Sequence, residues 1–413
     1  MRKESFSMLP ELMKFSDGRS VKTPEQWAER RKEILACYQT SVYGQMPDPS
    51  LEQISFAISG ENEAQTRDMA ITVKRGKRKA SFSVRVTLPE NRGLGLPCYI
   101  EYCPFFWLGK PLISPNMKIA AARGYAAIQY DPLSVAADSN LHEGAYFELY
   151  PYCEGQERQD GVLLDWAWGA SKVLDALEAG AGKELGIDPT LCMIAGVSRY
   201  GKSAAVAGAY DERFRVTIPS CSGMGGTAVF RTDNHGKIYD LSPLGGPENW
   251  VNESINEPFE NLTGGEGYWF CRNFRQTKKA EDLPVDQHML CALAAGKDRH
   301  LIMITGVTSE GWSNTEGQCL AYIASQPVWN LLEAGSHNNL IIHLDGHAIL
   351  PSDMEQILDY CDVHLLGKDK DGAMHSLRDM KGQLFLKHNR SRLDPLFDFY
   401  GTEIQSVLAF GGD

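Results

Sequence analysis

The sequence of 413 residues has no excess of positive charge and no long apolar run. Its net charge is −12, so the phosphates of a nucleic acid would repel the chain, and we expect no nucleic-acid partner. No apolar stretch reaches the roughly 18 to 20 residues that a helix needs to cross a bilayer. The first residues, MRKESFSMLPELMKF, have a basic start but lack the apolar core of a signal peptide. These absences argue against a membrane-spanning protein and against a nucleic-acid-binding domain.

Cysteine patterns typical of metal sites are also missing. The ten cysteines are scattered, without CxxC pairs and without histidine partners at metal-ligand spacing. We therefore expect no zinc and no other cofactor. Most of the cysteines are interpreted as buried thiols in strands, among them Cys98, Cys103 and Cys192.

The N-terminal third predicts a helix followed by antiparallel strands. Thr23 is a suitable helix cap, Pro24 takes the first helical position and Gln26 closes a capping box, which predicts a helix over residues 24–44. Period-2 patterning then predicts strands at residues 53–59, 68–75 and 81–88. The basic run 74–79 lies between the last two and is interpreted as a solvated hairpin turn.

From residue 97 onward, apolar strand-like runs alternate with helical stretches. The runs are CYIEYC, YAAIQYD, LCMIAGV, RVTIPS, LIMITGV and NLIIHLD. The clearest helices cover residues 160–179, 202–210, 316–333 and 353–366. Continuous apolar strands between helices predict a mostly parallel sheet covered on both faces. We therefore expect an α/β fold in which residues 1–413 form a single domain.

One long segment, residues 222–267, lacks clear periodicity and is rich in Gly, Asn, Pro and Glu. A loop of this length in a compact domain is usually either functional or disordered. Because it contains Trp250 and Phe259, we expect an ordered loop region over the active site.

The stretch GVSRYGKSAA, residues 196–205, fits two incompatible chemistries. As G-x-x-x-x-G-K-[ST] it would be a phosphate-binding loop ending at Lys202 and Ser203, with Asp345 after a later strand as a magnesium ligand. The loop lies midway along an acidic chain with no other basic cluster for a nucleotide. Its interior is also bulky where backbone N–H groups must wrap around phosphates. We therefore disfavour a nucleotide hydrolase.

The same stretch also fits a nucleophile elbow, in which a serine, an acid and a histidine follow in that order. Ser198, Glu310 and His347 supply the order, and each follows an apolar strand, at the carboxyl end where parallel sheets place their sites. The motif is imperfect, because Tyr200 holds the usual glycine position and Gly201 comes one residue later. The spacing favours a hydrolase.

GVSRYGKSA, followed by TIPSCSG, resembles the glucuronoyl esterases of carbohydrate esterase family 15, whose elbow reads G-C-S-R-x-G-K. GYWFCRNF, LPVDQHML, GWSNTEG and the N-terminal TPEQWAERRKEIL are also similar, so the resemblance covers most of the chain. It implies an α/β-hydrolase three-layer sandwich with antiparallel N-terminal strands and residues 1–50 as a helical extension packed on it. It also implies a serine esterase that cleaves the ester between lignin alcohols and the 4-O-methyl-glucuronic acid side groups of xylan.

The resemblance assigns the catalytic roles. Ser198 would be the nucleophile and His347 its base, with His343 in the core or supporting the site. Many members, especially fungal ones, carry a glutamate 23 residues after the serine, where this chain has Cys221. Glu310 matches the alternative acid position of bacterial members and is the predicted acid. The spare carboxylates are Asp298, Glu316 and Asp345.

Further roles concern the oxyanion and the sugar. The backbone N–H and the guanidinium of Arg199 would stabilise the oxyanion. Lys202 is similar to the family lysine that contacts sugar hydroxyls, and Trp312 to a tryptophan lining the sugar. Glu257 and Glu260 lie in the segment where the family places polar uronate contacts.

Many relatives also join a cysteine before the serine to one after the histidine. This chain has Val197 and Ala348 there, so both partners are missing, and we expect His347 to be held less firmly.

Two rival functions stay open: an acetyl-xylan or feruloyl esterase, and a weakly active carbohydrate-binding relative suggested by the missing acid at Cys221. We expect a carbohydrate substrate, no membrane partner and a monomer. The resemblance implies a secreted or periplasmic bacterial enzyme whose signal peptide lies outside this sequence.

Overall fold

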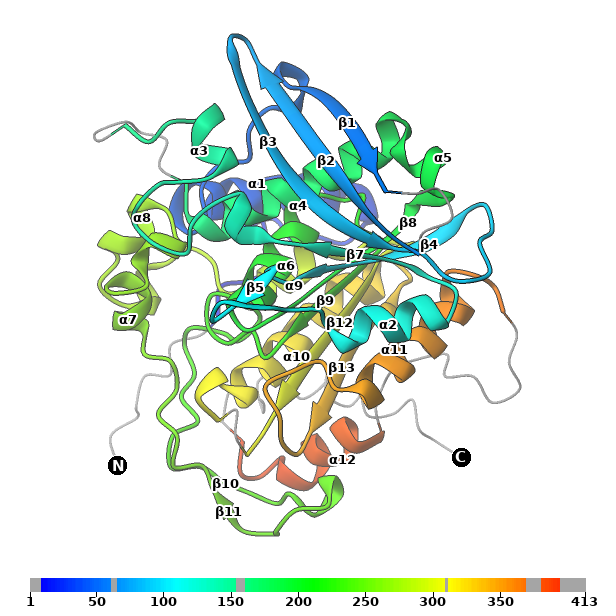
Figure 1. Ribbon diagram of the computed structural model, residues 1–413. Helices are drawn as coiled ribbons and strands as arrows, with labels where there is room; N and C mark the ends of the chain where they lie inside the picture. The colour runs from blue at the N-terminus through cyan, green and yellow to red at the C-terminus, as the bar shows by residue number, and fades with distance from the viewer. Residues whose placement is uncertain (1–8, 61–64, 154–159, 309–310, 369–379, 394–413) are drawn as a thin grey trace.

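The computed structural model describes residues 9–60, 65–153, 160–308, 311–368 and 380–393 (Figure 1). A nine-stranded sheet runs through it in the order β1-β2-β3-β7-β4-β8-β9-β12-β13. The strands are β1 (Gln53–Ser59), β2 (Thr66–Arg75), β3 (Arg78–Thr87), β4 (Leu96–Tyr102), β7 (Ala126–Tyr130), β8 (Ile187–Val197), β9 (Val216–Ser220), β12 (His300–Gly306) and β13 (Asn338–His343). Pairing is antiparallel from β1 to β7 and parallel from β7 to β13. The predicted mostly parallel sheet with antiparallel N-terminal strands is confirmed.

Helices cover the sheet on both faces. The main ones are α1 (Pro24–Ser41), α2 (Pro115–Ala122), α4 (Val162–Ala176), α6 (Arg199–Tyr210), α9 (Gln287–Leu293), α10 (Thr315–Leu331), α11 (Pro351–His364) and α12 (Met380–Asn389). Side chains of α2 and α11 pack with one set of strand residues, and those of α4, α6 and α10 with the alternate set. On β8, for example, Met193 faces the α2–α11 side and Ile194 the α4–α6 side. Burial on both faces explains why these strands are continuously apolar.

The N-terminal elements form much as predicted. The Thr23 hydroxyl accepts the Gln26 N–H at 3.3 Å, whereas the Gln26 side chain reaches past the cap to the Lys22 N–H at 2.8 Å. In the β2–β3 hairpin, Lys74 pairs with Lys79 across a turn whose charges face solvent, which confirms the hairpin. None of the described helices is long and apolar enough to cross a membrane.

The segment 222–267 is ordered and contains only short elements. These are β10 (Ile238–Tyr239), a 3₁₀ turn at Ser242–Leu244, β11 (Trp250–Val251) and α7 (Phe259–Thr263). Figure 1 shows it as a long excursion from the end of β9 past α12 to α7. The segment therefore has defined structure, and Glu257 within it contacts Lys202; a position over the active site stays a prediction.

A buried ion pair joins α4 to the chain just before β1. The Lys172 ammonium donates to Glu52 Oε2 at 2.6 Å and to Asp175 at 2.5 Å, and the Lys172 and Glu52 side chains are only 3% and 1% exposed. Glu52 Oε1 also accepts from the Tyr150 hydroxyl and the Trp168 indole. Both carboxylate oxygens of Glu52 thus have donors in place of water.

Lys172→Met should therefore lower the free energy of unfolding by about 3–5 kcal/mol, because it leaves the Glu52 carboxylate buried without its cation. Lys118→Met, at an exposed lysine of α2, should change it by no more than about 0.5 kcal/mol. Urea unfolding followed by circular dichroism measures both. Equal stability of the two variants would contradict a structural role for the pair.

Candidate active site

Ser198 lies on a sharp turn between β8 and α6. Its φ of 62° and ψ of −130° are rare for a residue with a side chain. A Cβ added to Gly196 would come within 2.3 Å of the Tyr200 carbonyl oxygen, and one on Gly201 within 2.6 Å of the Ser220 carbonyl oxygen. The two glycines are therefore the residues that allow this strand-turn-helix to close. In the usual elbow motif the second glycine would stand at position 200. Here it stands at position 201, because residue 201 is the one whose backbone approaches the end of β9.

The ends of β8, β9 and β13 meet through Ser220. The Ser198 N–H donates to the Ser220 carbonyl at 2.9 Å, and the Ser220 hydroxyl donates to the Ala348 carbonyl at 3.0 Å. Ala348 directly follows the exposed His347. The structure thus brings the predicted nucleophile and the predicted base to the same edge of the sheet, on either side of Ser220.

His343 is engaged in a way that suits a support and not a base. Its Nδ1 lies 3.1 Å from Asp353 Oδ2 and its Nε2 lies 2.9 Å from the Gly346 carbonyl oxygen. Both partners are acceptors, so both ring nitrogens carry protons. Burial lowers the pKa of His343, but Asp353 outweighs it and raises the pKa to about 10. Since His343 has no lone pair to receive a proton, the geometry favours His347 as the base.

Hydrogen bonds hold the loop that carries His347, and none of the ten cysteines forms a disulfide. The Gly346 carbonyl accepts from His343 and also from the Cys221 thiol, at 3.8 Å, and Ala348 accepts from Ser220. These contacts come from two neighbouring elements. They hold the loop at the place where relatives are expected to have a covalent link.

Arg199 is anchored by an aspartate that the sequence did not single out. Its Nη1 lies 2.6 Å from Asp138 Oδ2, and its guanidinium carbon lies 5.2 Å from the centre of the Trp269 ring. Asp138 Oδ1 accepts from the Tyr268 hydroxyl at 3.0 Å and from the Trp269 indole at 2.8 Å. Three donors converge on Asp138, which restrains the Arg199 side chain next to Ser198.

Lys202 lies below the surface, one helical turn after Ser198. Its ammonium donates to Glu257 Oε2 at 2.7 Å and to the carbonyls of Ser222 and Met224 at 2.9 and 2.8 Å, and its side chain is 1% exposed. A sugar hydroxyl would have to replace one of these three acceptors. The same contacts leave no donor for a nucleotide phosphate, which weakens the phosphate-loop interpretation further.

Trp312 connects the Lys202–Glu257 pair to His347. Its carbonyl accepts the Glu257 N–H at 2.9 Å, and its ring centre lies 5.6 Å from that of His347. Burial raises the pKa of Glu257, whereas the Lys202 ammonium lowers it. Lys202, Glu257, Trp312 and His347 therefore form a continuous set of contacts along the carboxyl edge of the sheet.

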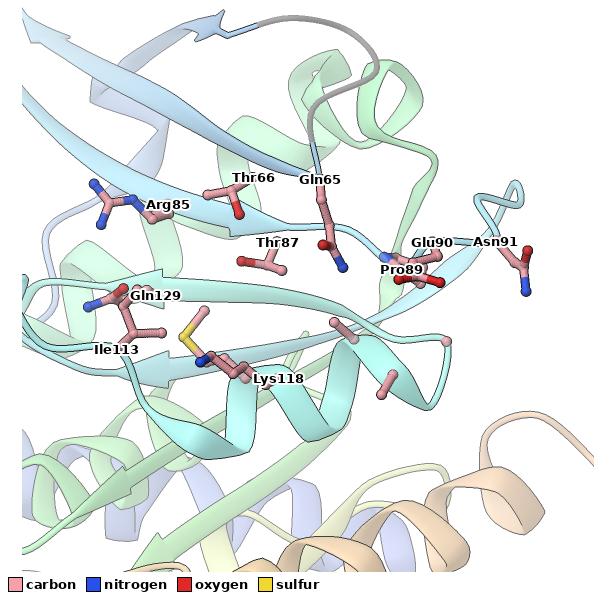
Figure 2. A pocket seen from close by; sticks show the side chains of 14 residues that line it. Gln65, Thr66, Arg85, Thr87, Pro89, Glu90, Asn91, Ile113, Lys118 and Gln129 are labelled. Carbon is pink, nitrogen blue, oxygen red and sulfur yellow. The ribbon is translucent and has the colours of Figure 1, made fainter.

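Two surface cavities differ in whether predicted site residues line them. One of about 310 Å³ is lined by Glu257 and by the exposed Glu260 at the start of α7. Another, of about 550 Å³, lies between β3, β7 and α2 (Figure 2). It includes Gly124, beside the amino end of β7, and none of the predicted site residues. The first cavity therefore adjoins the candidate site.

The predicted acid, Glu310, falls outside the described residues. Cys221 is buried at φ 44°, with its thiol against the loop that carries His347. Among the spare carboxylates, Glu316 is buried and bonded to the Tyr239 hydroxyl at 2.5 Å, and the exposed Asp345 accepts the N–H of the next residue. Asp298 precedes β12 and therefore lies at the opposite edge of the sheet from His347, so its selection as a spare acid was wrong.

Three residues of the site were missed from the sequence: Asp138, Tyr268 and Trp269. The two aromatics lie in the quoted GYWFCRNF motif, but Asp138 lies in an irregular stretch with no periodic or motif signal. Only the fold brings it to Arg199, 61 positions away.

Comparisons with known proteins agree with the resemblance. The family model "Glucuronyl esterase, fungi" matches residues 71–333. A multidomain esterase of Ruminococcus flavefaciens is 38% identical over 374 residues, 87% of this chain, and the chain spans 46% of that protein's length. The 4-O-methyl-glucuronoyl methylesterase of Hypocrea jecorina is 28% identical over 377 residues, which are 90% of this chain and 72% of that protein.

Among solved structures, a carbohydrate esterase family 15 glucuronoyl esterase from Caldicellulosiruptor kristjansonii is similar over 88% of this chain and 92% of its own, with a TM-score of 0.78 and 36% identity. The catalytic domain of the Hypocrea jecorina glucuronoyl esterase covers 90% and 92%, with a TM-score of 0.68 and 26% identity. The implied α/β-hydrolase fold and the sequence resemblance are therefore confirmed together. The chain belongs to the glucuronoyl esterases of carbohydrate esterase family 15.

Proposed function

We propose that this chain is a serine esterase that hydrolyses esters of 4-O-methyl-glucuronic acid side groups of xylan, with lignin alcohols as the leaving groups, and that its catalytic unit is one domain. The observation that carries the proposal is the convergence of Ser198, Arg199 and the loop of His347 at one edge of the sheet. A relative of the same fold, 24% identical, is a mutant glucuronoyl esterase from Sporotrichum thermophile in complex with methyl 4-O-methyl-β-D-glucopyranuronate. Because such esters occur in plant cell-wall material, we also propose that the enzyme acts outside the cytoplasm.

In the proposed reaction, His347 removes the proton of the Ser198 hydroxyl as its oxygen attacks the ester carbonyl carbon. The negative charge that develops on the carbonyl oxygen is stabilised by the Arg199 backbone N–H and by its guanidinium. His347 then gives its proton to the leaving alcohol, and an acyl-enzyme remains. Water, activated by the same histidine, releases the uronic acid and restores Ser198.

The uronate would be recognised on the side of the site where Glu257 lines a cavity and contacts Trp312. The Lys202 ammonium is bonded to the Glu257 carboxylate, so we assign the first sugar contacts to Glu257 and to the Trp312 ring. Lys202 contributes its positive charge. It would contact a sugar hydroxyl only by giving up one of its three present acceptors. Glu260 is exposed on the rim of the same cavity. A buried, paired charge next to a sugar favours a fixed orientation of its hydroxyls.

Ser198→Ala should reduce the turnover of a benzyl glucuronate ester by about 10⁴-fold or more, because it removes the nucleophile. Binding of methyl glucuronate, measured by calorimetry, should persist, and Ser59→Ala, at an exposed serine of β1, should leave both unchanged. Substantial residual turnover, or faster hydrolysis of acetylated xylan by the wild type, would reject the assignment.

Glu310→Gln should lower kcat by roughly 10² to 10⁴ with little change in KM, because the amide no longer stabilises the His347 imidazolium. Cys221→Ser should leave kcat nearly unchanged, since a buried thiol supplies no charge. Steady-state kinetics on the same ester measures both. If Glu310→Gln keeps its activity and Cys221→Ser loses it, the catalytic acid has been assigned to the wrong strand.

Asp138→Asn should lower kcat by about tenfold, a part of the 10²–10³ that loss of a whole oxyanion donor costs. The amide can still accept from Tyr268 and Trp269 but no longer restrains Arg199 by charge. The control is Asp68→Asn, which breaks an ion pair with Arg85 at 3.1 Å in the β2–β3 hairpin and should leave kcat unchanged. A positioning role predicts a change in kcat at constant KM and constant melting temperature; a shift in melting temperature alone would indicate a structural role.

A further inference from the structure

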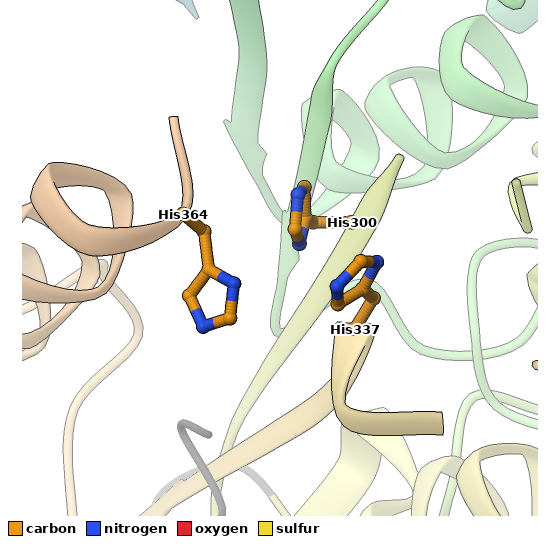
Figure 3. A group of neighbouring side chains, drawn as sticks. All are labelled: His300, His337 and His364. Atoms are coloured by element: carbon orange, nitrogen blue, oxygen red, sulfur yellow. The ribbon is translucent and has the colours of Figure 1, made fainter. Parts of the chain in front are cut away.

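Three imidazoles meet at the amino edge of the parallel strands, opposite the edge that carries Ser198 (Figure 3). His300 is the first residue of β12, His337 ends the 3₁₀ turn Gly335–His337 before β13, and His364 is the last residue of α11. One candidate ligand nitrogen from each lies within 4.8 Å of the other two. The ring centres are 4.1 to 5.6 Å apart.

Tyr360 directs a free lone pair of His300 into this group. The Tyr360 hydroxyl donates its proton to the Ser336 carbonyl at 3.3 Å. The same hydroxyl lies 2.7 Å from His300 Nδ1 and accepts from Asn339 Nδ2 at 3.3 Å, so in the tautomer that leaves the hydroxyl proton for Ser336 it also accepts from His300 Nδ1. The proton of His300 is then on Nδ1, and Nε2 keeps its lone pair. A hydrogen bond that fixes the tautomer in this way is typical of metal-ligating histidines.

His337 supplies a second lone pair that the protein does not use. Its Nδ1 is buried and meets no hydrogen-bond partner among the described residues. Buried polar atoms are normally paired, so this atom calls for an explanation.

The charges around the group are balanced. The Arg215 carbonyl accepts the His300 backbone N–H at 2.9 Å, and the positive charge of the Arg215 side chain would oppose a metal cation. Asp298 offsets this charge, because its carboxylate lies 3.7 Å from Arg215 Nη2. Neither side chain is needed as a ligand.

We propose that His300, His337 and His364 bind one divalent transition-metal ion, zinc being the simplest fit, and that the ion fastens the end of α11 to the starts of β12 and β13. Imidazole ligands suit zinc, and three of them with one water complete a tetrahedral site. Zinc–nitrogen bonds of about 2.0–2.1 Å require the nitrogens to approach to about 3.4 Å, a modest rotation of the rings. The site is structural because it lies away from Ser198. The three histidines come from elements that are far apart in the sequence. The expectation of no zinc was based on short spacings between cysteines and histidines, which cannot detect such a site.

Calorimetric titration of ZnCl₂ into the protein, stripped with EDTA and free of a histidine tag, should give one bound ion and a higher melting temperature. His337→Ala and His364→Gln should each weaken binding by at least about 100-fold, beyond the 10–100-fold typical of outer-shell losses. The matched control is His235→Ala, at an exposed histidine outside the group, which should bind zinc as the wild type does. In EDTA, His364→Gln should unfold like the wild type, which separates loss of a ligand from loss of the fold.

The spectrum of the Co²⁺-substituted protein distinguishes these ligands from the cysteines. Nitrogen ligation should give visible tetrahedral d–d bands without the near-ultraviolet band of a thiolate ligand. Hydrolysis of the glucuronate ester should be the same with and without zinc. The proposal is overturned if the wild type takes up no zinc, if both histidine variants bind it normally, or if the thiolate band is present.

Discussion

The backbone contact between Gly201 and the Ser220 carbonyl sets the geometry on which the rest of the site depends. It allows α6 to start directly over the end of β9, and it holds Ser198 at a φ that a relaxed chain would avoid. The same Ser220 then binds the loop after β13 through its hydroxyl. One residue at the end of a central strand thus relates the turn before α6 to the loop that carries the histidine, and larger side chains at either contact would separate them.

The cations of the site are each paired with a carboxylate, and each pair has a different consequence. Lys202 and Glu257 are almost fully buried, so their attraction offsets the cost of removing both charges from water. The pairing allows the Lys202 ammonium to stay charged below the site. Arg199 with Asp138 is partly exposed, and this pair restrains the Arg199 side chain beside Ser198. His343, paired with Asp353, is a cationic support of the loop that carries His347. Charges fixed in this way need no reorganisation when an oxyanion forms, which is how preorganised sites accelerate acyl transfer.

The two ends of the parallel strands carry different kinds of polar groups. At the carboxyl edge, loops of different length bring hydroxyl, guanidinium and imidazole groups to one face, as open α/β sheets commonly do. At the amino edge, the three histidines lie among buried side chains of α11 and the strand starts. The length of a strand separates the edge at which we propose ester hydrolysis from the edge at which we propose a metal ion beside α11.

Local pattern in the sequence determined the elements of the parallel sheet and the hairpin, because apolar runs and period-2 alternation follow directly from burial on two faces or on one. It also determined the strand-turn-helix around Ser198 and the position of His347 after a strand. Tertiary structure alone decided that Gly201 closes the elbow, that Lys202 is covered, that Asp298 lies at the wrong edge, and that Asp138 and three distant histidines join their partners. These contacts link residues that are remote along the chain, and strand order, which no local pattern encodes, determines which remote residues become neighbours.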